Sequence, residues 1–245
     1  MQSPFPQYAL TMAASALSIS SSSVSPTSLR QKLLNIFVSP SDVFDEVIES
    51  PRNLANWRIP TLLVCLVTVV SLQLGNSPTQ HSATLNYLTQ TGTISVAQAQ
   101  ALAGTWPLLS ALLVFLATFA GTCWSAFVLW FIGRMFLKVH FPYLKALEIV
   151  GLTGTISVLG TITTILLVAA SGDPTARPAL SLLLPKLDQT RAFHQILTTL
   201  DFFHLWTTTV LALALSRLCN ITFKEAAFWA FGYWMIARIV VIILN

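Results

Sequence analysis

The stretch WPLLSALLVFLATFAGTCWSAFVLWFIG, residues 106–133, contains no charged side chain and decides the fold class. A helix needs about 20 predominantly apolar residues to cross the hydrocarbon core of a bilayer, and this stretch exceeds that length. Further apolar runs lie at residues 59–75, 146–170, 200–219 and 226–244. We therefore predict an all-α integral membrane protein, folded as a five-helix transmembrane bundle.

The composition of the whole chain agrees with a lipid environment. Only 9% of the 245 residues are charged, 54% are apolar and the mean hydropathy is +0.71. Soluble domains use about 25% charged residues, so this chain lacks the polar side chains that a water-soluble surface needs. The net charge of +4 is spread between the apolar runs, and no Lys/Arg-rich run predicts a nucleic-acid partner.

The basic residues between the runs predict the topology. If the N-terminus is cytoplasmic, the inner segments hold nine basic residues: Arg30, Lys32, Arg52, Arg58, Arg134, Lys138, Lys145, Arg217 and Lys224. The opposite side holds three, and residues 76–105 have no charge. The positive-inside rule then places the N-terminus in the cytoplasm and, with five spans, the C-terminus outside. The expected location is the plasma (inner) membrane.

The chain divides into a leader and a membrane domain. Residues 1–38 include SALSISSSSVSPTS and have no charged side chain before Arg30. We expect a disordered Ser/Pro-rich leader here, with a cleaved signal sequence as the alternative. The five-span membrane domain is expected to occupy residues 39–245.

The stretch SPSDVFDEVIESPR, residues 39–52, predicts a short amphipathic interfacial helix before the first span. Pro40 suits a first helical turn and Pro51 ends the pattern. One face is apolar and is formed by Val43, Phe44, Val47 and Ile48. The opposite face carries four carboxylates. Two interpretations are open: the apolar face docks onto a partner or the bilayer surface, or it packs under the protein's own bundle.

Two charged residues fall within the predicted spans, where lipid makes them costly. Asp201 begins the fourth span and Arg238 lies near the end of the fifth. Because these spans run in opposite directions, we expect both residues at a similar depth near the outer surface. They are a candidate intramembrane ion pair, with His204 one turn from Asp201. The alternative is that Arg238 extends to the head groups.

Small residues in the second and third spans predict close helix packing. The candidate packing positions are Gly121, Gly151, Gly154 and Gly160. The third span is also rich in threonine, and a solute pathway is the alternative interpretation. Threonine hydroxyls in membrane helices usually bond to their own backbone carbonyls, which favours packing.

The sequence contains no pattern typical of catalysis or metal binding. HExxH and GxSxG are absent. The cysteines Cys65, Cys123 and Cys219 have no CxxC spacing and suit buried apolar positions. We therefore expect a non-enzymatic protein with no catalytic residues, no bound metal and no cofactor.

Four stretches together resemble the Yip domain family of five-span membrane proteins named for Ypt/Rab interaction, and in particular its prokaryotic branch. They are SPSDVFDEVIESPRNLANWRIPTLLV (39–64), LKALEIVGLTGTISVLGTI (144–162), LDFFHLWTTTVLALAL (200–215) and ITFKEAAFWAFGYWMIARIVVIIL (221–244). The most specific features are the Pro/Phe/Glu/Pro helix before the first span, and an aspartate followed five residues later by tryptophan. The resemblance covers about residue 35 to the C-terminus.

This resemblance implies a helical bundle with a cytoplasmic N-terminus that organises membranes through partners. It supplies no catalytic residues. We expect an adaptor that binds membrane lipid and a membrane or cytoplasmic protein whose identity the sequence does not give. A homo-oligomer, in which the partner is a second copy of the chain, is a further interpretation. The alternative is a small transporter or channel subunit. Gly151 is followed by Leu152 where eukaryotic trafficking members have a Gly-Tyr motif, so Rab binding does not follow from the resemblance.

Overall fold

Every secondary-structure element in the described part of the chain is a helix. The structure is a computed structural model that describes residues 27–75, 89–93, 95–173, 176–183, 197 and 200–244. The elements in chain order are α2 (Leu29–Asn35), α3 (Pro40–Glu49), α4 (Ala55–Gly75), α6 (Val96–Phe131), the π-helical turn η1 (Ile132–Phe136), α7 (Tyr143–Ser171), the 3-10 turn η2 (Leu180–Leu183), α9 (Phe202–Cys219) and α10 (Phe223–Leu244). The predicted all-α class is confirmed over these residues.

In the described ranges, four helices are long and apolar enough to cross a membrane. The candidate spans are Ala55–Leu74, Thr105–Phe136, Tyr143–Ser171 and Phe202–Cys219. They match the first four predicted runs, with the first and third starting a few residues earlier than expected. The fifth predicted run lies in α10, which is not one of these four, so a five-span count stays a proposal.

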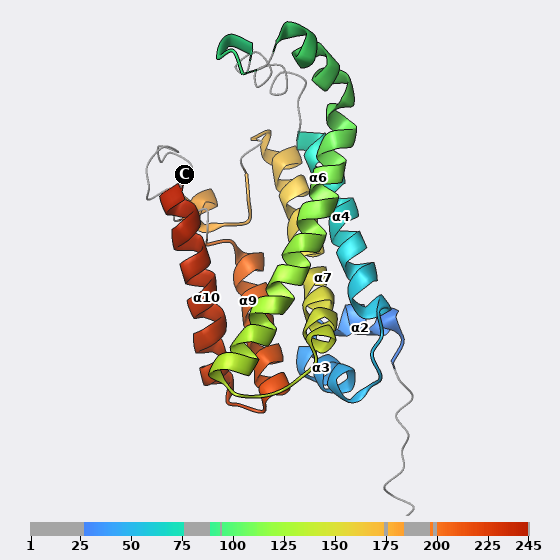
Figure 1. The fold of residues 1–245 in the computed structure, drawn as a ribbon, viewed down its shortest axis with the longest axis vertical. Helices are drawn as coiled ribbons and strands as arrows, with labels where there is room; N and C mark the ends of the chain where they lie inside the picture. The colour runs from blue at the N-terminus through green and yellow to red at the C-terminus, as the bar shows by residue number, and fades with distance from the viewer. Residues whose placement is uncertain are drawn as a thin grey trace, which may run out of the picture.

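The helix α7 is central to the bundle. It contacts α4, α6 and α9, while α10 packs mainly against α9. Figure 1 shows the long helices running roughly lengthwise, with α2 and α3 at one end of the bundle. The end of α6, the start of α7 and the α9–α10 turn lie at this same end, which we call the α3 end.

Local sequence signals set several helix boundaries. Ser95 and Gln98 form the predicted capping box at the start of α6 through reciprocal hydrogen bonds of 3.2 and 2.8 Å. Asp201 caps α9. α7 ends where Gly172 adopts a φ of 70°, and α9 ends where Asn220 adopts a φ of 52°. Glycine and asparagine tolerate this left-handed conformation best.

The leader differs from expectation at its C-terminal end. Residues 29–35, expected to be disordered, form α2, which Ser28 caps by accepting a hydrogen bond from the Gln31 amide. Lys32 and Ile36 are buried, and α2 contacts α3, α4 and α7. These tertiary contacts supply the order that local composition did not predict. Residues 1–26 lie outside the described part.

The distribution of large apolar side chains fits a molecule surrounded by lipid. The core gathers near the α3 end and includes Phe44, Ile149, Leu152, Ile156 and Leu215. Large apolar side chains are exposed along the outer faces of the long helices, for example Leu66, Leu74, Leu108, Leu166 and Ile236. Soluble monomers rarely expose contiguous apolar surface on this scale.

Candidate functional site

The helix predicted before the first span forms as α3 and packs under the bundle. Val43, Phe44 and Val47 are 2%, 0% and 0% exposed, and Ile48 is partly buried against the same core. Because α3 contacts α9 and α7, the protein's own helices occupy this apolar face. Of the two interpretations left open by the sequence, the structure agrees with packing under the bundle.

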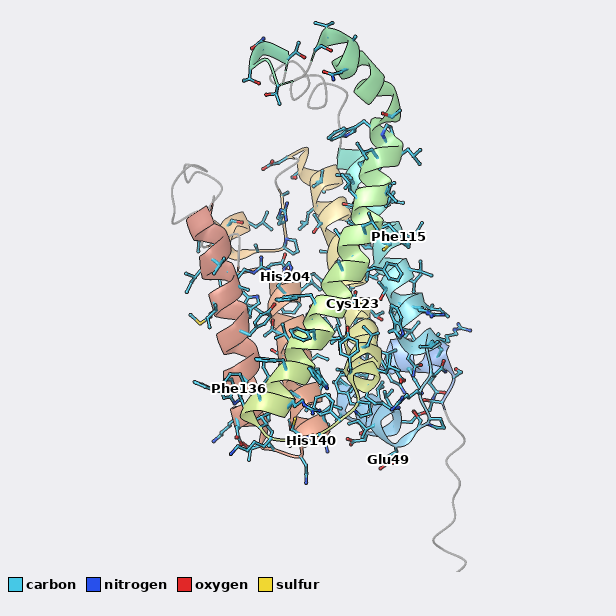
Figure 2. All side chains as sticks on the ribbon, in the orientation of Figure 1. Glu49, Phe115, Cys123, Phe136, His140 and His204 are labelled. Carbon is cyan, nitrogen blue, oxygen red and sulfur yellow. The ribbon has the colours of Figure 1, made fainter. Side chains whose placement is uncertain are left out.

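The opposite face of α3 carries four carboxylates, which differ in exposure. Asp42 and Glu49 are exposed, and Figure 2 shows Glu49 at the edge of the α3 end, pointing away from the bundle. The Asp45 carboxylate lies 3.4 Å from the guanidinium of Arg217 on α9, in an exposed pair. A pair of this kind contributes at most about 1 kcal/mol. We call Asp42, Asp45, Glu46 and Glu49 the acidic face of α3.

Glu46 joins α3 to the start of α2. Its carboxylate accepts hydrogen bonds from the Thr27 amide (2.9 Å) and the Thr27 hydroxyl, and lies 3.3 Å from the buried ammonium of Lys32. Partial burial disfavours the ionised form of Glu46. The hydrogen bonds from Thr27 and the charge of Lys32 outweigh this effect, so the pKa of the Glu46 carboxyl lies below its usual value.

A buried lysine fastens the C-terminal end of α3 to the bundle. Lys145, in the first turn of α7, donates hydrogen bonds to the carbonyl oxygens of Val47 (2.5 Å) and Ser50 (2.7 Å). Carbonyls at the end of a helix have no partner within that helix, and the helix dipole favours a cation there. Lys145 therefore caps α3 from a different helix.

The charge of Lys145 is balanced inside the same buried cluster. Glu148 lies one turn further along α7, 3.6 Å from the Lys145 ammonium, and accepts a 2.8 Å hydrogen bond from the Asn56 amide group on α4. Lys145, Glu148 and Asn56 are all buried. These three side chains join α3, α4 and α7 at one point, and we call them the clasp.

The clasp was not among the predicted sites, although the sequence carries a signal for it. Lys145 was predicted to belong to a basic cytoplasmic segment, and Glu148 lies inside the predicted run 146–170. A carboxylate within a span is costly and usually has a partner. A lysine three residues earlier is on the same helical face, so the pair was detectable. Asn56 had no signal of its own.

Two of the four candidate packing glycines lie at close helix crossings. A Cβ added to Gly151 would lie 2.4 Å from the Trp57 Cα, and one added to Gly160 would lie 2.9 Å from the Phe203 Cβ. These positions bring α7 against α4 and α9. At Gly154 the nearest atom would be at 3.7 Å, an ordinary contact. Gly121 differs from expectation because nothing described lies within 4 Å.

Asp201 and Arg238 make separate contacts. The Asp201 carboxylate accepts hydrogen bonds from the amides of Phe203 (2.8 Å) and His204 (3.2 Å), and lies 3.6 Å from the His204 Nδ1. The Arg238 guanidinium lies 5.9 Å from the ring centre of Trp234. Among the described residues, the ion pairs within 4 Å do not include Asp201–Arg238. Asp201 directly precedes α9, so its carboxylate turns to the first amides of that helix.

The described side chains present no constellation typical of catalysis or metal binding. No group of three or more His, Cys, Asp or Glu residues within the described ranges could hold a metal ion. The Glu148 carboxylate in the clasp contacts the Lys145 ammonium and the Asn56 amide group. The buried Lys145 ammonium donates its hydrogen bonds to backbone carbonyls. The arrangement can fix α3 in place and present its acidic face.

These observations define a multi-pass helical membrane protein with a charged helix folded against one end of its bundle. The family model of the Yip1 domain matches residues 34–244, nearly the whole chain. The chain therefore belongs to the Yip1 domain family, which confirms the resemblance seen in the sequence. No curated protein and no solved structure matches it.

Proposed function

We propose that this Yip1-domain protein crosses the membrane five times, with the α3 end in the cytoplasm and the C-terminus outside. α10 has 22 residues, about 33 Å at 1.5 Å per residue, which is enough to span. The nine basic residues predicted to be cytoplasmic belong to segments at the α3 end (Figure 1). The positive-inside rule supports this orientation.

Cysteine labelling in intact cells tests the orientation. Ser41→Cys on α3 and Ser181→Cys on η2 are introduced separately into a Cys-free background. The cysteine at position 181 should react with a membrane-impermeant thiol reagent, and the cysteine at position 41 should react only after permeabilisation. The reverse pattern would overturn the orientation.

The biochemical role that the geometry supports best is that of a non-enzymatic adaptor that holds a cytoplasmic protein at the membrane through the acidic face of α3. The observation that carries this proposal is the burial of Phe44 and its neighbours beneath α3. With its apolar side occupied, α3 offers a partner its opposite side, where the exposed carboxylates of Asp42 and Glu49 have no ion pair within 4 Å in the described residues. A protein with a basic patch is the matching partner, because complementary charge steers and orients association. The Yip1 domain family is not known as an enzyme family.

Charge reversal on α3 tests the adaptor proposal. Asp42→Lys/Glu49→Lys reverses the two exposed carboxylates that have no ion pair within 4 Å in the described residues. Glu225→Lys is the matched control, because Glu225 is an exposed carboxylate at the same end, on α10. The readout is site-specific photo-crosslinking from position 41 in native membranes, followed by identification of the adduct.

The adduct formed by the wild-type protein should persist in the Glu225→Lys control and disappear in the double variant. It should also weaken with added salt, since exposed charge interactions are screened. An adduct unchanged by charge reversal would overturn binding through the acidic face. The transporter alternative gains no support from the described spans. The first, third and fourth spans run as α-helix, and the second leaves the α-helix only in its last five residues, the π-helical turn η1, whereas transporter sites typically form at helices broken near the midplane.

A further inference from the structure

A group of basic side chains gathers at the end of α9 that is distant from α3. His204 lies in the first turn of α9, and Figure 2 places it beside α10. Arg238 lies on α10, which packs against α9. Arg177 is brought to the same place by backbone hydrogen bonds, from the Phe202 amide to Pro178 (3.0 Å) and from the Leu180 amide to Leu200 (3.3 Å).

Within the described residues, the positive charge of this group is only partly balanced. The carboxylate in contact with it there is Asp201, which caps α9 and lies 3.6 Å from the His204 Nδ1. Neither Arg177 nor Arg238 has a carboxylate oxygen within 4 Å in the described part of the chain. The Asp201 carboxylate already accepts hydrogen bonds from the first amides of α9. An anion bound at this place must therefore be held by the arginine side chains.

The surroundings of Arg238 determine what kind of anion can reach it. Exposed apolar side chains flank it along α10, namely Met235, Ile236, Ile239 and Val240. In a bilayer these side chains face acyl chains, while a long arginine side chain can extend toward the head groups. A ligand that contacts both the arginine and the apolar surface of α10 must carry an anionic group joined to acyl chains.

We propose that Arg177 and Arg238, with His204 beside them, bind the headgroup phosphate of an anionic phospholipid whose acyl chains lie along the outer face of α10. The planar guanidinium matches phosphate oxygens through paired hydrogen bonds, and such charge-assisted bonds are stronger than neutral ones. The site is at the opposite end from the acidic face of α3 and does not depend on the adaptor proposal. It would fix the position of α10, which contacts mainly α9.

The test uses the full-length protein in mild detergent, titrated with phosphatidylglycerol, with phosphatidylcholine, or with inorganic phosphate alone. Native mass spectrometry counts retained lipid, and thermal unfolding reports stabilisation. The variant is Arg177→Gln/Arg238→Gln. The matched control is Arg30→Gln/Arg52→Gln, which removes two exposed arginines at the α3 end.

Phosphatidylglycerol should stabilise the wild-type protein and the control more than phosphatidylcholine does, and should bind the Arg177→Gln/Arg238→Gln variant about tenfold more weakly, since one lost charge-assisted hydrogen bond is enough for that factor. If that variant does not fold, Arg177→Lys/Arg238→Lys keeps both charges and loses the paired geometry, and its affinity should fall between the two. Equal retention in the wild type and both arginine variants would overturn the site. Full stabilisation by inorganic phosphate would overturn its assignment to lipid.

Discussion

Gly151 lies directly against the backbone of Trp57, so that a Cβ at position 151 would be only 2.4 Å from the Trp57 Cα. This contact brings α7 and α4 together at the level of the clasp, where Asn56 reaches Glu148. A side chain at position 151 would push the two helices apart. The two helix backbones can therefore approach this closely only because position 151 is a glycine, as at other closely packed membrane helices.

Gly151→Ala should lower the free energy of unfolding by about 1–3 kcal/mol, the usual cost of overpacking. Gly121→Ala is the matched control on another span, because nothing described lies within 4 Å of the added methyl group. Its stability should stay within about 1 kcal/mol of the wild type, the difference in helix propensity. Unfolding of both variants in the same detergent makes the comparison, and equal losses would contradict the packing argument.

The contrast between these two glycines shows how far small-residue spacing predicts packing. Spacing alone could not separate Gly151 and Gly160 from Gly121, because it marks a face of one helix and does not say what lies opposite. The opposing surfaces belong to Trp57 and Phe203, which are distant in the sequence. Apolar run length, by contrast, predicted four spans closely, since it depends only on local composition.

Lys145→Met should be among the most destabilising single changes outside the apolar core. It leaves the Glu148 carboxylate buried without its cation, and removes the donor to Val47 and Ser50. Breaking a buried ion pair from one side costs about 3–5 kcal/mol. The measurement is unfolding of the purified protein.

The double variant Lys145→Met/Glu148→Gln provides the control. A neutral amide at position 148 can still contact Asn56 and no longer carries an uncompensated charge, so part of the lost stability should return. The two single changes should then be strongly non-additive. Additive losses would show that Lys145 acts only on α3 and that its pairing with Glu148 contributes nothing.

Acidification should loosen the junction of α2 and α3. The pKa of Glu46 is lowered in the folded protein, so its stabilising contribution is complete above the ordinary glutamate pKa of 4.5 and is lost as the pH falls through the lower folded value. The protection factors of α2 amides against hydrogen exchange, which are corrected for the pH dependence of intrinsic exchange, should fall over this range in the wild type. Glu46→Gln should show lower protection factors already at neutral pH and lack this pH-dependent step.

Asp201 and Arg238 should contribute almost independently to stability. Asp201→Ala removes the cap of α9 and should cost about 1 kcal/mol. Arg238→Gln removes a side chain with no carboxylate within 4 Å in the described residues. A double-mutant cycle in lipid-free detergent should therefore be additive within about 0.5 kcal/mol. A coupling clearly above this value would restore the direct ion pair that the sequence suggested.

The sequence placed these two residues at one depth but could not assign their partners. Depth follows from counting residues along two antiparallel runs, whereas partner choice depends on side-chain direction. The position of Asp201 at the start of the fourth predicted span did indicate one partner, because an aspartate just before a helix typically caps its first amides. For α3 the sequence likewise predicted the apolar face of Val43, Phe44 and Val47, and left open whether this face meets the bundle or a partner.

Substitutions on the two faces of α3 should separate folding from partner binding. Phe44→Ala removes a ring that is 0% exposed and should cost about 3–5 kcal/mol, the range for buried Phe-to-Ala changes. Asp42→Asn/Glu49→Gln changes only exposed groups and should stay within about 0.5 kcal/mol of the wild type. Both variants should still insert into the membrane, since insertion depends on the apolar spans.

Crosslinking from position 41 then completes the comparison. The carboxamide variant should lose the wild-type adduct at unchanged stability, because binding is assigned to the charge of the acidic face. Phe44→Ala should lower the stability of the protein, and any loss of the adduct should follow from unfolding. The adduct should therefore return at a lower temperature at which this variant stays folded. The opposite outcome, an adduct that depends on Phe44 in a protein whose stability does not, would mean that α3 leaves the bundle to bind its partner through the apolar face. The acidic face would then not be the binding surface.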